Sequence, residues 1–172
     1  MADDIVIWPS KLLNSPTEPV TDFGPALAEL LLRMQDSVRE ADGIGIAANQ
    51  IGVALRVALV GREDGTFFPI CNPEILERTE DIELREGCLS VPNEFDVVKR
   101  FRKVRVKYQD AAGTWHEEVA EDRLAHVFQH EIDHLYGKVF VEHLSSLKRG
   151  LIRQKMTKLQ KADLKKKAER SP

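Results

Sequence analysis

Apolar residues recur at intervals of three and four positions in three stretches of the chain, and this spacing predicts three helices. The first stretch has Pro25 near its start, where a proline suits the first helical turn, and stops before Asp42-Gly43. The second stops at Gly137, a typical residue just after a helix end. The predicted helices cover residues 24–40, 121–136 and 145–168.

The middle of the chain instead shows apolar runs and alternating apolar and polar positions, which predict strands. The alternation is clearest in Val104-Arg105-Val106-Lys107-Tyr108. The predicted strands cover residues 53–60, 66–72, 74–85, 95–110 and 114–119, with a hairpin turn at 62–65. Strands in the middle and helices at both ends favour an α+β fold. We expect mixed or antiparallel strands packed around the helix over 121–136, with an N-terminal and a C-terminal helix on the outside.

Length and composition indicate one globular domain spanning residues 1–172. Of the 172 residues, 42% are hydrophobic and 31% are charged, which is ordinary for a domain with a single core. The longest apolar runs are too short to cross a bilayer, and the acidic start does not resemble a secretory signal. We therefore expect a cytoplasmic protein without a membrane partner.

The net charge of −3 is unevenly distributed. Between Lys148 and Arg170 there are ten Lys or Arg residues and two acids, so the rest of the chain carries 15 basic and 26 acidic residues. A basic tail over about 145–172 is either a solvated helix face or a surface that contacts an acidic partner such as RNA.

The strongest chemical signal is His130-Glu131-Ile132-Asp133-His134, which fits the pattern H-E-x-x-H. Residues four apart share one face of a helix, so both imidazoles can reach the same ion. Glu131 is close enough to bond to a metal-bound water without taking a coordination place. The alternative is a pair of surface histidines beside an incidental glutamate, but the surrounding apolar positions indicate a buried face.

Two histidines leave such a site one ligand short, because a catalytic zinc-type centre usually has three protein ligands and an open position. The candidates are Cys88, His126, His143 and an acid further along the chain. A zincin protease would have its third histidine at position 140, which is Phe140 here. His126 shares a face with His130, but a trio at i, i+4 and i+8 spans roughly 12 Å, too far for one ion.

The two cysteines have different surroundings. Cys71 follows an apolar run and is expected to be a buried, reduced residue, whereas Cys88 lies in a short, polar, glycine-containing segment that suits a ligating thiolate.

Three separate segments, taken together, resemble the signature motifs of the peptide deformylase family in both order and spacing. They are Gly43-Ile44-Gly45-Ile46-Ala47-Ala48-Asn49-Gln50, Glu86-Gly87-Cys88-Leu89-Ser90 and His130-Glu131-Ile132-Asp133-His134. The resemblance extends over residues 5–150. One such motif alone would be weak evidence, but three in this order are specific.

This resemblance implies a hydrolase that removes the N-formyl group from N-formylmethionyl peptides of nascent proteins and releases formate. It implies one divalent metal ion held by Cys88, His130 and His134, with iron(II) in the cell, although the donor set also suits Zn²⁺, Ni²⁺ or Co²⁺. Glu131 would then be the acid/base, and the side chain of Gln50 and the backbone N–H of Leu89 would stabilise the oxyanion.

Expectations for substrate binding follow from the same resemblance. An extended peptide would pair with the first motif, where glycines allow close approach. Arg123 and His126 stand where family members usually have apolar residues, so they would make the pocket for the first side chain narrower or more polar. Asp133 is expected to hold a ligand histidine through its free ring N–H, and Glu86 and Arg100 are expected to pair near the site and fix the Cys88 loop. The expected substrate-binding residues are Gly43, Ile44, Gly45, Ile46, Arg123, His126 and Val127.

The resemblance also implies that the basic tail contacts the ribosome, and we expect a monomer. Two alternatives stay open: a hydrolase of the same chemistry with a different acyl group or first residue, and a non-catalytic member that binds the ribosome.

Overall fold

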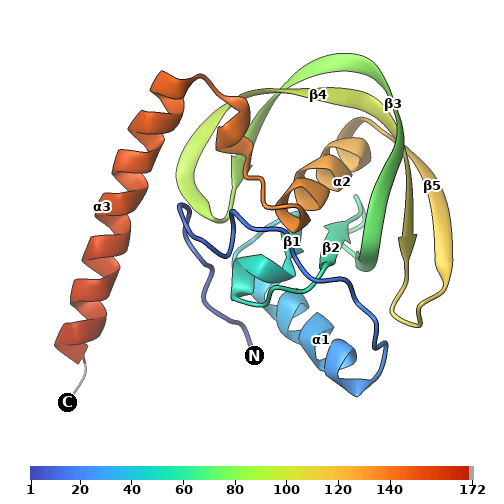
Figure 1. Ribbon diagram of the computed structural model, residues 1–172, viewed down its shortest axis with the longest axis horizontal. Helices are drawn as coiled ribbons and strands as arrows, with labels where there is room; N and C mark the ends of the chain where they lie inside the picture. Colours follow the sequence, from blue (N-terminus) through green and yellow to red (C-terminus); the bar gives the residue numbers. More distant parts are fainter. Residues whose placement is uncertain (171–172) are drawn as a thin grey trace.

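The computed structural model describes residues 1–170. The middle of the chain, where buried and exposed residues alternate, forms a five-stranded sheet. Its order is β1-β2-β3-β4-β5, and every neighbouring pair is antiparallel. The long β3–β4 ribbon arches over the molecule (Figure 1). The strands are β1 (Gly45–Ala47), β2 (Val57–Gly61), β3 (Phe67–Cys88), β4 (Val91–Gln109) and β5 (Trp115–Glu121).

Helix α2 (Asp122–Leu135) lies in the hollow of this sheet (Figure 1). Its apolar face packs on the inward residues of the strands, and Phe128, Ile132 and Leu135 share one buried cluster with Val60 and Val106. Burial of this face fixes the helix on the sheet and so determines where the motif at its C-terminal half points.

Helix α1 (Pro25–Glu40) covers the other side of β1 and β2, where Leu27, Leu30, Met34 and Val38 are buried. A short 3-10 turn, η1 (Ala48–Ile51), follows β1 and is fully buried.

Helix α3 (Ser146–Arg170) follows a second 3-10 turn, η2 (Phe140–His143), and stands to one side of the body (Figure 1). Only Ile152 and Met156 of this helix are buried, in a cluster that includes Trp8 and Phe140. Gln160 ties the helix to the N-terminal segment, because its Nε2 donates to two backbone oxygens there, at 2.8 and 2.9 Å. The last two positions of the predicted tail, 171 and 172, lie outside the described residues.

The α+β fold with an antiparallel sheet and terminal helices agrees with the prediction, and the predicted helices are confirmed to within two residues at each end. Three of the five strand predictions had wrong bounds. The run over 53–60 becomes a strand only at Val57. The stretches 66–72 and 74–85 form the single strand β3, because the sheet absorbs Pro73 as an irregularity of register between Cys71 and Glu74.

Both cysteines are free thiols, and Cys71 is fully buried, as predicted. Burial raises the pKa of Cys71 to about 12, which keeps the thiol protonated and unreactive. Within residues 1–170, no helix combines the length and the hydrophobicity needed to span a bilayer.

Candidate active site and metal centre

The C-terminal half of α2 and the end of β3 bring three metal-ligating atoms together. His130 and His134 lie one turn apart on α2, and Cys88 is the last residue of β3. Their ligand atoms all lie within 4.8 Å of one another. The Nε2 of His134 is 3.3 Å from Cys88 Sγ and 3.2 Å from His130 Nε2. Among the described residues, neither His126 nor His143 joins this group.

These spacings fit a single divalent ion. Nitrogen and sulfur donors at ordinary bond lengths around a tetrahedral ion lie about 3.3–3.6 Å apart. Burial lowers the pKa of His134 well below its ordinary value, which keeps the imidazole neutral, as a ligand must be. Burial also acts to lower the pKa of His130, but Cys88 and Glu86 outweigh it and raise that pKa well above its ordinary value. The centre therefore attracts positive charge.

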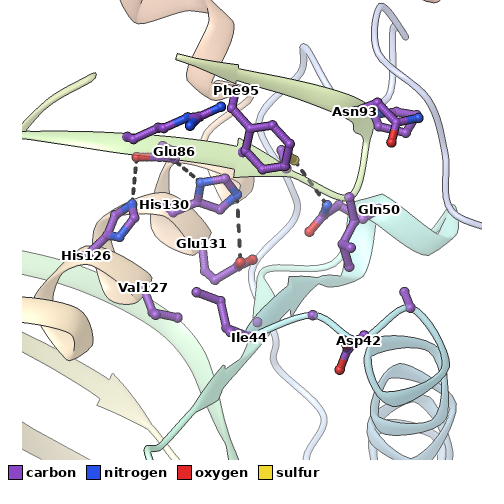
Figure 2. Close-up of a pocket in the computed structure, with 18 residues that line it drawn as sticks. Asp42, Ile44, Gln50, Glu86, Asn93, Phe95, His126, Val127, His130 and Glu131 are labelled. Atoms are coloured by element: carbon purple, nitrogen blue, oxygen red, sulfur yellow. Dashed lines mark hydrogen bonds and ion pairs between the residues drawn. The ribbon is translucent and has the colours of Figure 1, made fainter. Parts of the chain in front are cut away.

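Glu131 lies beside His130 (Figure 2) and is not one of the three ligand residues. Its Oε1 is 3.9 Å from His130 Nε2, and its Oε2 is buried with no hydrogen-bond partner among residues 1–170. Burial raises the pKa of Glu131 to about 7, near the value at which a carboxylate both takes and returns protons at neutral pH. A partnerless buried oxygen is costly unless a ligand uses it, which points to a water or substrate proton at this position.

Gln50 lies on η1 and faces the triad of ligand residues Cys88, His130 and His134. Both the oxygen and the nitrogen of its side-chain amide form hydrogen bonds. Its Oε1 accepts a hydrogen bond from the backbone N–H of Ala47 at 2.9 Å. Its Nε2 donates to Ser90 Oγ at 3.1 Å and lies 3.6 Å from Cys88 Sγ. Leu89 follows Cys88 and lines the same cavity. The structure thus brings both predicted oxyanion donors to the site, while their action on an oxyanion stays a prediction.

A buried carboxylate, Glu86, organises the centre from behind. Both of its oxygens accept from Arg100, at 2.6 and 3.0 Å. One oxygen also accepts from Nδ1 of His130, and the other from Nε2 of His126 at 2.8 Å. Burial alone would raise the pKa of Glu86, but these bonds hold it well below its usual value. Glu86 is therefore an ionised acceptor that orients a ligand histidine.

The predicted Glu86–Arg100 pair is confirmed, whereas the partner predicted for a ligand histidine was wrong. Asp133 accepts from Arg100 at 2.6 Å and from His143 at 2.9 Å, so its carboxylate points away from the ligand rings. Sequence spacing could not reveal this, because Glu86 reaches α2 only through the register of β3.

Most of the side chains around the triad line one cavity of about 550 Å³: Gln50, Glu86, Cys88, Leu89, His126, His130 and Glu131. Of the predicted substrate-binding residues, Gly43, Ile44, Gly45, His126 and Val127 are in its wall. The side chains of the other two, Arg123 and Ile46, are outside this wall. Arg123 is exposed in the first turn of α2, where its long side chain reaches solvent. Ile46 is fully buried in the core against α1, because alternation along β1 turns its side chain away from the cavity.

Two glycines of the first motif, Gly43 and Gly45, are required for a packing reason that the sequence did not suggest. A Cβ on Gly45 would lie 2.9 Å from Glu131 Oε1, and one on Gly43 would lie 2.9 Å from Leu89 Cδ1. Both positions therefore make room for the site's own side chains, whether or not a substrate also approaches there.

Several wall residues were missed by sequence reasoning, because they lie outside the three motifs. Four of them lie on β3 and β4, where the pairing of Gly87 with Phe95 brings them to the rim, and the other two directly follow α1. Only a prediction of that register could have found the four on the strands. They are Ala41, Asp42, Arg85, Pro92, Asn93 and Phe95.

Comparison with known proteins shows which family the chain resembles. The family model described as Polypeptide deformylase matches residues 2–150. The peptide deformylase of Desulfotalea psychrophila is 44% identical over 159 residues, covering 90% of this chain and 94% of that protein. The peptide deformylase of Pseudomonas aeruginosa is 42% identical over 158 residues, covering 90% of this chain and 94% of that protein.

The chain is also similar to solved structures of peptide deformylases. A crystal structure of a peptide deformylase from Legionella pneumophila has a TM-score of 0.88 and 38% identity, and the match covers 100% of both chains. The peptide deformylase from Ehrlichia chaffeensis in complex with actinonin has a TM-score of 0.88 and 35% identity, covering 91% of this chain and 96% of that one.

Proposed function

The chain belongs to the polypeptide deformylase family, a family of enzymes, and on this premise we propose that it hydrolyses the N-formyl group of N-formylmethionyl peptides from nascent proteins, releasing formate. One observation carries the proposal: Cys88, His130 and His134 converge beside the buried carboxylate of Glu131, and all of them except the buried His134 line a single cavity.

The donor set suits one divalent metal ion, for which we propose iron(II) in the cell, with Zn²⁺, Ni²⁺ or Co²⁺ as substitutes. When bound by Cys88, His130 and His134, such an ion supplies Lewis-acid activation of water at neutral pH. Glu86 holds His130 in the tautomer whose Nε2 is free to act as a ligand.

The chain's own residues do the rest of the chemistry. Glu131 takes a proton from the attacking water and passes it to the leaving amine, which its pKa of about 7 allows. The N–H groups of Gln50 and Leu89 donate to the oxygen of the formyl group as it becomes negative. Loss of one such donor typically costs about 10²–10³ in rate.

The peptide binds as an added strand. In the part of the chain that the structure describes, strand β1 pairs only with β2 and so leaves one edge of the sheet unpaired. Gly43, Ile44 and Gly45 line the cavity at this edge. An extended peptide paired there would bring its formyl group towards the metal ligands.

A second candidate is a deformylase-like hydrolase with a changed preference for the first residue or the acyl group. It is favoured by His126, a polar side chain in the wall one turn before His130. Formyl-Met, formyl-Ala and formyl-Glu peptides distinguish the two. An ordinary, strong preference for methionine contradicts the second candidate.

We also propose that the distal part of α3 contacts ribosomal RNA. Gln160 anchors the helix to the N-terminal segment, and beyond it lie Lys161 and the run Lys165-Lys166-Lys167. Replacing Lys161, Lys165 and Lys166 by Glu should weaken salt-sensitive ribosome binding and leave turnover of short peptides intact. Deletion from residue 148 is a poorer test, because it removes the buried residues Ile152 and Met156. Unchanged ribosome binding contradicts this role.

The deciding experiment is turnover of formyl-Met-Ala-Ser by anaerobically purified, iron-loaded protein. Glu131→Ala should lower kcat by about 10²–10⁴. Glu29→Ala, which removes an exposed helix glutamate, should match the wild type. Metal content is measured for all three proteins. Absence of turnover with metal bound would contradict the proposal and favour the altered-substrate or the non-catalytic alternative.

A further inference from the structure

An aromatic ring projects over the rim of the cavity. Phe95 is 58% exposed, unusual for so large an apolar side chain, and its ring lies above the site (Figure 2). It pairs with Gly87 across β3 and β4, and a Cβ on Gly87 would lie only 2.5 Å from the ring. The ring therefore folds across the neighbouring strand because that position is a glycine.

An arginine is stacked on this ring. The guanidinium carbon of Arg85 lies 5.3 Å from the centroid of Phe95, a distance typical of a cation–π contact. Arg85 also lines the cavity. Its partner across the sheet is Val97, which offers no charge. The contact with Phe95 thus holds an otherwise mobile cation at the rim.

Arg85 has no carboxylate within 4.0 Å among residues 1–170. This distinguishes it from Arg100, Arg102 and Arg105 on β4, each of which forms ion pairs with two acids. Asp96, whose pKa Arg85 helps to lower, is already paired with Lys148 at 3.2 Å. A substrate carboxylate would thus find the guanidinium without an ion-pair partner.

The position of Arg85 selects which part of a peptide it meets. Arg85 precedes the ligand Cys88 by three residues of extended chain, about 10 Å at roughly 3.3 Å per residue. An extended peptide whose formyl group is at the metal ligands advances by the same amount per residue, so its third side chain lies about 10 Å away.

We propose that Arg85, held by Phe95, makes the enzyme prefer formyl peptides with an acidic side chain at the third position. The inference rests on the proposed function. The contact is solvent-exposed, so the preference is modest and salt-sensitive: about three- to five-fold in kcat/KM over a neutral residue at low salt, carried by KM.

The test uses formyl-Met-Ala-Xaa-Ala peptides with Xaa as Glu, Gln or Lys and amidated C-termini, because a free carboxylate at the end of a tripeptide would itself reach Arg85. The wild type should rank them Glu, Gln, Lys. Arg85→Glu should reverse this order. Arg78→Glu, an equally exposed arginine on β3 outside the cavity wall, makes the same change in net charge and should leave the order unchanged.

Each outcome decides the proposal. Reversal by Arg85→Glu but not by Arg78→Glu, weakened by added salt, supports it. Equal turnover of all three peptides, or an order that Arg85→Glu does not change, overturns the inference while leaving the deformylase function in place. Failure to hydrolyse any formyl peptide overturns the proposed function, and the inference with it.

Discussion

The β3–β4 ribbon carries ion pairs in two settings that differ in burial. Behind the metal ligands, Glu86 and Arg100 have side chains that are 1% and 4% exposed. Further along the same ribbon, Glu77 and Arg105 have side chains that are 64% and 35% exposed. The residue types and the N–O distances are similar, 2.6 Å in the first pair and 3.1 Å in the second.

The difference shows what each pair contributes. Glu86 has its acceptor positions filled by Arg100, His126 and His130, so its geometry is determined by several partners and in turn fixes a ligand ring. Arg105 spans Glu77 and Glu117 on a solvated face, where water can replace either partner. Buried pairs position the site, and exposed pairs cover the sheet.

The largest effect on stability is expected from removing Arg100, one partner of the buried pair, while Glu86 remains. Arg100→Met leaves Glu86 and Asp133 without their shared cation, and uncompensated buried charge typically costs about 3–5 kcal/mol. The free energy of unfolding of chelator-treated protein, measured in urea, checks this value without a contribution from metal binding.

The matched control is Arg105→Met, the same change on the same strand at an exposed site. Its free energy of unfolding should stay within experimental error of the wild type. Equal losses in the two variants would show that burial does not distinguish the two regions.

Glu131 is a buried carboxylate without a paired cation, so replacing it should stabilise the protein at high pH, whereas replacing Arg100 destabilises it. Glu131 has a pKa of about 7 when folded against an ordinary value of 4.5, so the folded state holds this proton more tightly than the unfolded state does. The protein therefore loses stability as pH rises from 4.5 through 7. Glu131→Gln removes this loss, so its stability relative to the wild type should improve by about 2–3 kcal/mol between pH 5 and pH 8.

Urea titrations of the metal-free wild type and Glu131→Gln at several pH values measure this difference in the free energy of unfolding. Only its change with pH is interpreted, because any pH-independent cost of the substitution then cancels. The exposed Glu29→Gln is the control and should show no such trend. A pH-independent difference for Glu131→Gln would mean that the carboxylate is solvated or paired in solution.

The same contrast explains what sequence could predict. The three helices could be located from the spacing of apolar residues and from the residues typical of helix ends. Both are local features of the sequence, such as the apolar face of α2 and the glycine that follows it. The triad atoms were also predictable, since His130 and His134 are one turn apart and the motif of Cys88 resembles a known one.

Features that depend on strand register were not predictable. Phe95 lies over Gly87, and Glu86 beside it faces His130, because β3 and β4 keep one register after two irregularities, between Cys71 and Glu74 and between Ile75 and Glu77. Arg123 shows the limit of face-based reasoning: it lies on the same helical face as His126, but it is in the first turn of α2, where the cavity wall has ended.

The smallest effect is expected within the exposed pairs. A double-mutant cycle on Arg105 and Glu77, each replaced by Ala, should give a coupling close to experimental error at physiological salt. Any coupling seen at low salt should disappear as salt is added, because exposed charges are screened. The equivalent cycle on Arg100 and Glu86 should keep its coupling over the same salt range, since water and ions do not reach the buried pair. A salt-resistant coupling in the exposed pair would remove the distinction between the two regions.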